Sequence, residues 1–332
     1  MTAISVVLAA YRGEKYIGEQ LRSLFAQTRL PDEILIGDDS PDAATRRAIA
    51  GVLPEKPASV KLEIIVNPAP LGVVKNFAAL LARASGDGVF LCDQDDIWLP
   101  EKIARLTAAF EAHPKKMVFA CDSWRVNEDL SARGERLLPR RAAPWIAAQI
   151  NRGGALALVP RYLFAYGHNL LVRREFIARA LPVPENYLGC DAWFRNLAAL
   201  TEKFYYENAP LTYYRVHENN VTNLELTGFP VTRLTRYRQI RAMSGAEKIA
   251  EFSRRRDEFI TLKIEAEKRL FAEEIPPVNR QLLAQFIDFY ARRIEVTPLP
   301  RWRRPWKLLR AAPLYFSAGT GWRAWLRDWF SR

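Results

Sequence analysis

Cysteine is scarce in this sequence, and none of it is arranged for a disulfide framework or a zinc site. Three cysteines, Cys92, Cys121 and Cys190, lie far apart in 332 residues, and no Cys-x-x-Cys pair occurs. An odd and dispersed set of this kind excludes a disulfide scaffold and a zinc knuckle. We therefore expect the protein to work in a reducing compartment, the cytoplasm.

Long apolar runs are missing as well. No stretch of about 18 apolar residues occurs. No basic segment precedes the apolar residues 4–9, so we expect neither a transmembrane helix nor a cleaved signal peptide. The balance of 49% apolar and 26% charged residues is typical of a globular protein. The length suits one large α/β domain with an appendage, or two modest domains.

The glycine-rich loops of the common nucleotide-binding motifs are also absent. The sequence contains no Gly-x-x-x-x-Gly-Lys, and no Gly-x-Gly-x-x-Gly follows its first apolar segment. Any phosphate group that binds here is therefore not held mainly by the backbone amides of such a loop.

Two hydrophobic periodicities alternate over the first 125 residues. Short β-branched runs predict strands at residues 4–9, 33–36, 62–66, 89–92 and 117–120. Between them, residues 14–26 and 74–84 carry apolar side chains at helical spacing. This alternation predicts an α/β fold, a parallel sheet with crossover helices.

A polar cluster follows each of the first four strands. These clusters are Ala10-Tyr11-Arg12, Asp38-Asp39, Lys75-Asn76 at the end of a loop, and Asp93-Gln94-Asp95-Asp96. Open α/β sheets bind ligands at the carboxyl ends of their strands. The three carboxylates of the last cluster repel phosphate, and a bridging divalent cation reconciles the two. We therefore expect a metal-bound nucleoside diphosphate, with ribose and base donors facing Asp38 or Asp39.

Helix capping is the alternative role for these carboxylates. Asp38 and Asp39 could cap a helix that starts near Pro41. Capping alone is a poorer explanation for Asp93, Asp95 and Asp96, because three adjacent like charges repel one another and a cap does not require them.

Four segments match one family in order: SVVLAAYRGEKYIGEQLRSLFAQT, EILIGDDSPD, LGVVKNF and FLCDQDDIWLPEKI. Over roughly residues 3–222 the chain resembles a bacterial family 2 glycosyltransferase of the GT-A fold. Within that family it resembles the rhamnosyltransferase-like branch, which builds cell-surface polysaccharides. The resemblance implies metal-dependent transfer of a sugar from a nucleotide diphosphate donor, with Mn²⁺ or Mg²⁺ as the cofactor.

The resemblance also assigns roles to residues of the first four clusters. The donor nucleotide would contact Ala10, Tyr11, Arg12, Asp38, Asp39, Lys75, Asn76 and Asp93. In the D-x-D element Asp93-Gln94-Asp95, the first Asp would meet the ribose and Asp95 would bind the cation. Asp96 is a second possible cation ligand, and Asp96 and Trp98 are further candidates for phosphate or acceptor contacts.

The segment PENYLGCDAWFRNLAAL fits the block in which this family places its general base. Asp191 would take the proton from the acceptor hydroxyl, and a single attack of this kind inverts the anomeric centre. The alternative is an Asp that caps the helix predicted at residues 192–200. Cys190 stands where relatives often carry His, which leaves the role of that position in doubt. Trp193 is either core or an acceptor contact.

The segment LTYYRVHENNVT fits the block that carries the family's cation-binding His. His217 would complete the metal shell, and this imidazole favours Mn²⁺ over Mg²⁺. Arg215 could lie near the phosphates. His168, in YGHNLLVRRE, would contact the acceptor from its loop.

The chain divides into three predicted parts, a catalytic domain at residues 1–222, a helical extension at 223–300 and a tail at 301–332. The tail holds eight of the basic residues against one acidic residue, a net +7 of the total +12. Its apolar stripe consists of Trp322, Trp325, Leu326, Trp329 and Phe330. Such a segment either binds the anionic inner face of the cytoplasmic membrane, near a saccharide or lipid-linked saccharide acceptor, or packs on its own domain.

Other classes of protein remain as alternatives. A metal-dependent phosphohydrolase could use Asp93 and Asp95 to release phosphate from a simple ester. A basic nucleic-acid-binding protein would fit the net charge, but it leaves the acidic cluster unexplained, and aromatics are not interleaved with the basic surplus outside the tail. We therefore expect no nucleic-acid partner. A non-catalytic relative is disfavoured by the presence together of Asp39, Asp95, Asp191 and His217.

Overall fold

The fold is that of a computed structural model of the chain. The residues it describes are 2–160, 162, 164–187, 189–218, 220, 242–269, 271–300, 302–304 and 308; the side chains of 132–134 are left out. The apolar tail residues named above, Trp322 to Phe330, lie outside the described residues. Among the described residues, no helix combines the length and apolar character needed to span a bilayer.

Within the described residues, nine strands form one mixed sheet. They are β1 (Ile4–Ala10), β2 (Glu33–Asp38), β3 (Lys61–Val66), β4 (Gly88–Asp93), β5 (Ile97–Trp98), β6 (Val118–Val126), β7 (Ala132–Arg136), β8 (Leu170–Arg173) and β9 (Phe204–Arg215). The order is β3-β2-β1-β4-β8-β6-β9-β5, with β7 paired to β6. The first four strands are parallel, as predicted. The fifth predicted strand is the start of β6, and the antiparallel strand β8 separates it from β4.

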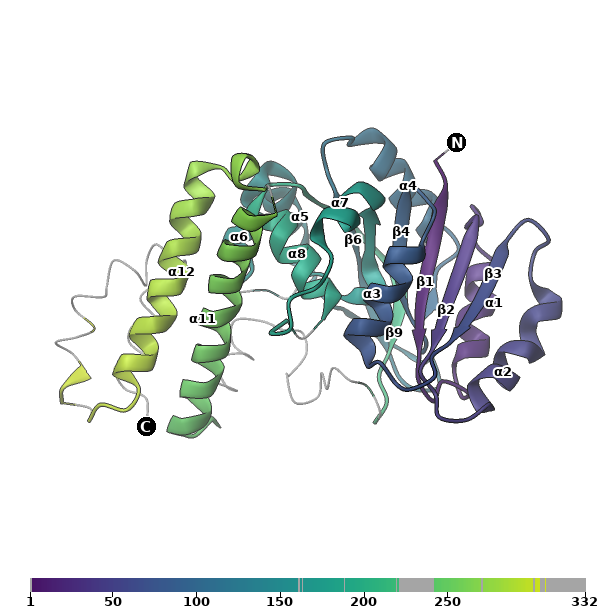
Figure 1. The fold of residues 1–332 in the computed structure, drawn as a ribbon, viewed down its shortest axis with the longest axis horizontal. Helices are drawn as coiled ribbons and strands as arrows, with labels where there is room; N and C mark the ends of the chain where they lie inside the picture. The colour runs from purple at the N-terminus through teal and green to yellow at the C-terminus, as the bar shows by residue number, and fades with distance from the viewer. Residues whose placement is uncertain are drawn as a thin grey trace.

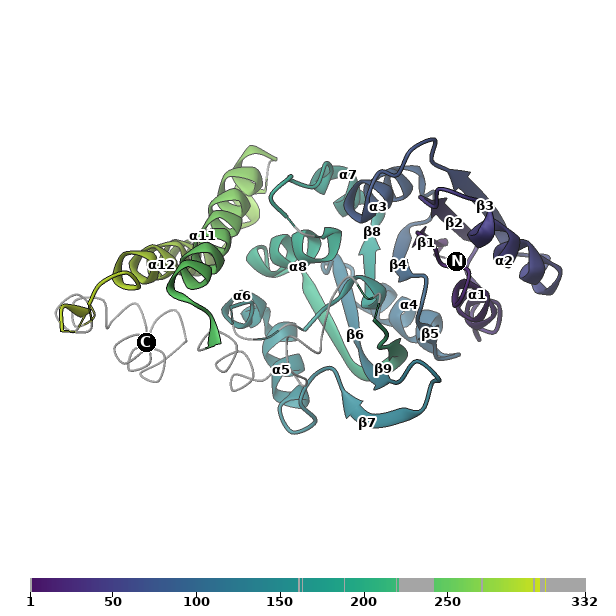
Figure 2. The same cartoon turned by 90° about the horizontal axis from the view of Figure 1, so that it is seen from below.

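Helices cover both faces of the sheet, as the cartoon turned by 90° shows (Figure 2). The helices in chain order are α1 (Ile17–Phe25), α2 (Ala44–Val52), α3 (Val73–Arg83), α4 (Lys102–Ala112), α5 (Ala143–Gln149), α6 (Ala155–Leu158), α7 (Arg174–Ala180), α8 (Cys190–Leu200), α11 (Gly245–Lys268) and α12 (Pro277–Val296). Successive side chains of β1 point to opposite faces. Val6 and Leu8 pack with α1, α2 and α4, whereas Val7 packs with α3, α7 and α8. Apart from Ser5, β1 is therefore apolar along its length, because both of its faces are covered.

The parallel register places the polar clusters at one edge of the sheet. Ala10 of β1 pairs with Asp38 of β2, and Ala9 pairs with Asp93 of β4. The strands β1, β2 and β4 therefore end side by side, and the chain leaves each of them into a loop at the same edge. This is the arrangement that the sequence predicted for the candidate site.

The two long helices α11 and α12 form an antiparallel pair beyond α8, at the end of the molecule opposite β3 (Figure 1). Ser244 caps α11 in a reciprocal pair with Glu247. Phe259 of α11 meets Phe286 of α12, with ring centroids 5.2 Å apart. Both helices share the apolar core that lies on the α8 face of the sheet. The helices predicted between residues 223 and 300 are therefore present, and their core is continuous with that of the sheet.

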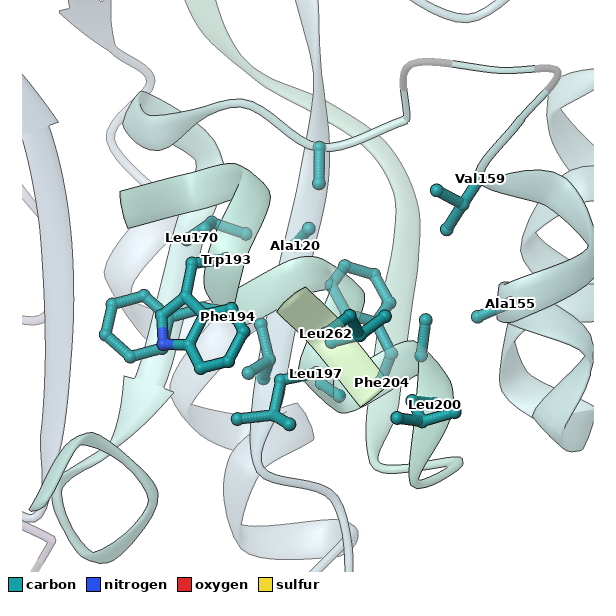
Figure 3. Packing of buried hydrophobic residues seen from close by; sticks show 14 of the residues in the cluster. Ala120, Ala155, Val159, Leu170, Trp193, Phe194, Leu197, Leu200, Phe204 and Leu262 are labelled. Atoms are coloured by element: carbon teal, nitrogen blue, oxygen red, sulfur yellow. The ribbon is translucent and has the colours of Figure 1, made fainter. Parts of the chain in front are cut away.

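Trp193 lies in this core and not in the site. Figure 3 shows it with Phe194 and Leu197 of α8, near Leu262 of α11. The side chain is 0% exposed, and its Nε1 donates to the carbonyl of Ala180 at 2.8 Å. The acceptor contact considered for Trp193 is therefore wrong, because α8 turns that face inward.

Truncation of Trp193 tests its packing role. We expect Trp193→Ala to lower the free energy of unfolding by about 3–5 kcal/mol, the usual cost of removing a buried large aromatic side chain. Urea denaturation of the wild type and the variant measures this difference. A loss below about 1 kcal/mol would contradict the core position of this side chain.

Candidate active site

A cavity of about 460 Å³ opens at the edge of the sheet where β1, β2 and β4 end. Its lining includes the strand-end residues Ala10, Tyr11, Asp39, Asp93 and Asp95, and the residues Asn76, His168 and Asp191 from elsewhere in the chain. The structure therefore brings eight of the predicted site residues around one cavity, although they come from segments far apart in the sequence. Apolar side chains at the start of α3, Val73, Val74 and Phe77, form another part of the wall.

Asp39 and Asp38 have different environments. Asp39 lines the cavity, where its two carboxylate oxygens accept from the Asn67 side chain at 2.6 Å and from the Gly72 amide at 2.9 Å. Asp38 is fully buried, pairs with Arg46 at 2.7 Å and accepts from the Ser40 amide. The predicted donor contact of Asp38 is therefore wrong, because its carboxylate is used inside the protein. Helix capping is excluded for both, since α2 begins only at Ala44.

Two other predicted donor contacts are not among the residues that line the cavity. Arg12 and Lys75 are exposed and do not line it. Arg12 has a φ of 50°, and its amide donates to the Ser40 hydroxyl at 2.9 Å. Asn76 does lie at the cavity, where its side-chain amide donates to the carbonyl of Gly37 at 2.9 Å. A Cβ on Gly37 would lie 2.1 Å from the Asn76 oxygen, so this approach requires glycine.

The carboxylates of the loop after β4 gather around His168. The nearest ligand atoms of Asp93, Asp96 and His168 all lie within 4.8 Å of one another. His168 Nδ1 is 3.4 Å from Asp96 Oδ2 and 3.7 Å from Asp93 Oδ2. His168 is 1% exposed and lines the cavity beside the acidic loop, so its acceptor contact stays a prediction.

The two ring nitrogens of His168 face different partners. Ser123 Oγ donates to Asn169 Oδ1 at 2.9 Å, so the same oxygen must accept from His168 Nε2, 3.1 Å away. Nδ1 faces the carboxylates of Asp93 and Asp96. Asp96 Oδ2 is buried and has no hydrogen-bond donor, and burial raises the pKa of Asp96 to about 7. A buried carboxylate oxygen without a donor, next to a second carboxylate and an imidazole, is suited to hold a cation.

Asp95 and His217, predicted as metal ligands, also lie together. His217 Nε2 is 2.9 Å from Asp95 Oδ2, and the imidazole stacks on the Tyr16 ring with centroids 4.7 Å apart. Asp95 lines the cavity. The two side chains therefore have the contact that a shared cation requires, and their role as ligands stays a prediction.

Arg215 holds the acidic loop in place. Its guanidinium donates to the carbonyls of Asp95 at 2.9 Å and Glu128 at 2.6 Å and also pairs with the Glu19 carboxylate. Its amide donates to Asp96 Oδ1 at 3.1 Å. The side chain is buried and does not line the cavity, so the expected phosphate contact is wrong.

Removal of this guanidinium should therefore affect stability even without donor. We expect Arg215→Met to lower the free energy of unfolding by about 2–4 kcal/mol, because two partly buried carbonyls lose their donors. Arg105→Met, which breaks an exposed ion pair with Glu207, is the control and should cost less than about 1 kcal/mol. Unchanged stability of donor-free Arg215→Met would instead support a phosphate contact.

The side chains of Asp96, in the acidic loop, and of Trp98, just after it, are buried. Trp98 is 2% exposed, and the ammonium of Lys102 lies 3.5 Å from its ring centroid. Lys102 Nζ donates to the carbonyl of His168 at 2.5 Å and to Thr212 at 2.9 Å, and burial lowers the pKa of Lys102 to about 8. Trp98 is therefore a core residue and not a ligand contact. Asp96 does not line the cavity itself, but its carboxylate contacts His168, which does.

Asp191 lies in the first turn of α8 and lines the cavity. Gly189 occupies the N-cap position, so the capping alternative for Asp191 is wrong. Burial raises the pKa of the Asp191 carboxyl, and nearby Arg195 opposes that rise. Cys190, next to it, donates to the carbonyl of Val74, and burial raises the pKa of this thiol to about 12. The thiol is therefore neutral and does not act as a base.

Three features of the site were not predicted from the sequence. Lys102 carries a buried charge, Gln94 bonds to the loop after β1, and Tyr166 and Tyr214 stack with His168. The aromatic spacing in LTYYRVH gave a signal for Tyr214. A lysine in the first turn of a helix is ordinarily exposed, so no local signal indicated Lys102.

The chain has relatives of known family and fold. The family model "Glycosyl transferase family 2" matches residues 5–180. An uncharacterised glycosyltransferase of Nostoc is 25% identical over 233 residues, which cover 65% of this chain and 66% of that relative. The chain thus spans just under two thirds of the length of that relative.

Two solved structures share the fold. S. aureus TarS 1-349 in complex with UDP-GlcNAc has a TM-score of 0.52 at 16% identity, covering 98% of this chain and 89% of that one. The mannosyltransferase PcManGT from Pyrobaculum calidifontis, in complex with GDP-Man and Mn²⁺, has a TM-score of 0.52 at 14% identity, covering 99% and 85%. These likenesses support the GT-A architecture, and the family match covers more than half of the sequence. The chain therefore belongs to glycosyl transferase family 2.

Proposed function

We propose that this protein is an inverting, metal-dependent glycosyltransferase. It moves a sugar, with rhamnose as the first candidate, from a nucleotide diphosphate donor to a hydroxyl of a cell-surface polysaccharide or lipid-linked saccharide. The observation that carries the proposal is one cavity lined by the strand-end carboxylates Asp39, Asp93 and Asp95 and, from α8, by Asp191. A nucleotide sugar needs both groups of residues, one to bind it and one to activate its acceptor.

The donor would lie along the strand ends. Asp39 and the exposed ring of Tyr11 face the cavity at the ends of β2 and β1, where they can hold the base and ribose. Asp93 lies next to them and has room for a ribose hydroxyl, because Gly167 leaves space beside its carboxylate. The similarity to a protein whose structure contains GDP-Man and Mn²⁺ supports this placement.

The residues present fit a divalent cation. Asp95 and His217 are in contact, and in the Asp93, Asp96 and His168 group the buried Asp96 Oδ2 has no hydrogen-bond donor. Carboxylates with imidazole favour Mn²⁺ over Mg²⁺, which prefers oxygen ligands. When bound, the cation supplies charge stabilisation to the leaving diphosphate. Asp95 and His217 would hold it.

Asp191 would act on the acceptor. Its carboxylate accepts the proton of the attacking hydroxyl while that oxygen forms a bond to the anomeric carbon. The bond from this carbon to the diphosphate oxygen breaks, and the electron pair leaves with the nucleoside diphosphate. A single displacement of this kind inverts the configuration.

A panel of nucleotide sugars tests the proposal. We expect one donor to raise the melting temperature in the presence of Mn²⁺ and to yield free nucleoside diphosphate when an acceptor is added. A phosphohydrolase would instead release inorganic phosphate from simple esters. If no nucleotide sugar stabilises the protein or is turned over, the transferase proposal fails.

Membrane binding by the tail is a separate part of the proposal. We infer that residues 301–332 hold the protein on the inner face of the cytoplasmic membrane, close to a lipid-linked acceptor. Trp302, at the start of this segment, is 67% exposed. Arg304 does not contribute to such a surface, because its guanidinium donates to the carbonyls of Leu299 and Thr297.

A further inference from the structure

Gln94, the central residue of the D-x-D element, connects the loop after β4 to the loop after β1 by hydrogen bonds. Its Oε1 accepts from the Tyr11 amide at 2.9 Å, and its Nε2 donates to the Tyr11 carbonyl at 3.0 Å. The carboxamide thus forms the same pair of bonds that a neighbouring strand would form with Tyr11. It continues the pairing of β1 and β4 beyond Ala9 and Asp93, where their register ends.

The opposite loop is shaped to receive this side chain. A Cβ on Gly13 would lie 2.2 Å from Gln94 Oε1 and 2.9 Å from its Cδ, so the close approach requires glycine. Between Gly13 and Tyr11, Arg12 has a φ of 50°, in the left-handed region that is costly for a residue with a side chain. The Gly13 amide donates to Thr45, and the Arg12 amide donates to Ser40. These two hydrogen bonds and the two from Gln94 therefore help to hold this turn.

We propose that Gln94 is a positioning residue for donor binding. It acts through Tyr11, a residue that is 48% exposed and lines the cavity. Gln94 holds the Tyr11 backbone against the loop of Asp93 and Asp95. It thereby sets the distance between Tyr11, which would contact the base, and Asp95, which would bind the cation. The inference rests on the proposed function, because Tyr11 and Asp95 have these roles only in a nucleotide-sugar transferase.

The chemistry of the carboxamide explains why the position holds glutamine. A glutamate there would lose the donor to the Tyr11 carbonyl and would add a charge to the acidic loop. An alanine would leave the Tyr11 backbone to water, and the loop after β1 would keep its bonds to Ser40 and Thr45 and those that the Gly13 carbonyl accepts from Tyr16 and Ile17. Gln94 therefore lies within the acidic element without needing to touch the cation itself.

The contact of Gln94 with the loop after β1 is tested without ligand by a double-mutant cycle, in which the melting temperature is measured. We expect Gly13→Ala to lower the melting temperature of the wild type by a few degrees, because its Cβ displaces Gln94. In the Gln94→Ala background the same change should have little effect, since the nearest remaining atom, the Cβ of residue 94, is 3.6 Å away. Gly51→Ala, with nothing within 4 Å, is the control and should not lower the melting temperature in either background.

The role in donor binding is tested by kinetics on the same variants. We expect Gln94→Ala and Gly13→Ala each to raise the donor KM about tenfold, the effect of losing two neutral hydrogen bonds, and the double variant to be no worse. The kcat at saturating donor and the affinity for Mn²⁺ alone should stay within about twofold of the wild type. Additive melting-temperature changes, or an unchanged donor KM, would overturn the proposal. Absence of any transferase activity in the wild type would contradict the proposed function instead. The double-mutant cycle would then still test the contact of Gln94 with the loop after β1.

Discussion

Replacement of Asp191 by asparagine should lower turnover by a factor of about 10²–10⁴, the usual contribution of a positioned general base. Asparagine keeps the size of the side chain but cannot accept the proton of the acceptor hydroxyl. Donor binding should be nearly normal, because Asp191 lies at the start of α8 and not in the strand-end loops that would hold the nucleotide. Initial rates with saturating donor, together with calorimetric donor binding, measure the two effects separately.

The pH profile gives an independent check on Asp191. Burial raises the pKa of this carboxyl above its ordinary value, and a base must be ionised to act. Activity should therefore be full above the raised pKa and should fall as the pH is lowered through it. The exposed Asp288 on α12 provides the control, and Asp288→Asn should leave both rate and profile unchanged. Turnover of Asp191→Asn at the wild-type rate would remove Asp191 from the mechanism.

Replacement of Asp95 by asparagine should abolish the dependence of donor binding on Mn²⁺. Residues that merely support a metal ligand contribute about 10–100-fold to metal affinity, so loss of a direct ligand should cost at least about 100-fold. Asp95 can be tested cleanly, because Arg215 contacts its backbone carbonyl and not its carboxylate. Titration of the protein with Mn²⁺, followed by the melting temperature with and without donor, measures the loss.

Two histidines provide the matched pair for this test. His217→Gln should behave like Asp95→Asn, because the two side chains are 2.9 Å apart. His113→Gln should behave like the wild type, since His113 stacks on Tyr205 on the other side of the sheet from α3. Stabilisation by Mn²⁺ that survives in Asp95→Asn would mean that the ion is held elsewhere, with the Asp93, Asp96 and His168 group as the first place to look.

The sequence predicted the parts of the fold that depend on local pattern. The alternation along β1 reflects its two covered faces, and the polar residues that follow β1, β2 and β4 meet because the parallel register aligns these ends. The insertion of β8 between β4 and β6 could not be predicted in this way. It depends on a strand about fifty residues further along the chain that pairs antiparallel with both neighbours.

The same distinction explains which site residues were misplaced. Asp38 and Asp39 are adjacent and chemically identical, and they differ only because Arg46 meets one and Asn67 the other. Arg215 follows the expected motif, but its partners Glu19 and Glu128 come from α1 and from the loop after β6. Motif spacing identifies the loop that carries a charge. Which way the charge points is decided by tertiary partners that the motif does not contain.

The central claim is that a divalent cation bound at Asp95 lets an anionic donor approach an acidic wall. A crystal soaked with Mn²⁺ and the nucleoside diphosphate of the best-stabilising donor tests it most directly. We predict an anomalous manganese peak within bonding distance of Asp95 and His217, with the diphosphate on its far side and the base near Asp39. A well-ordered crystal in which the nucleotide binds without any such peak would contradict the account.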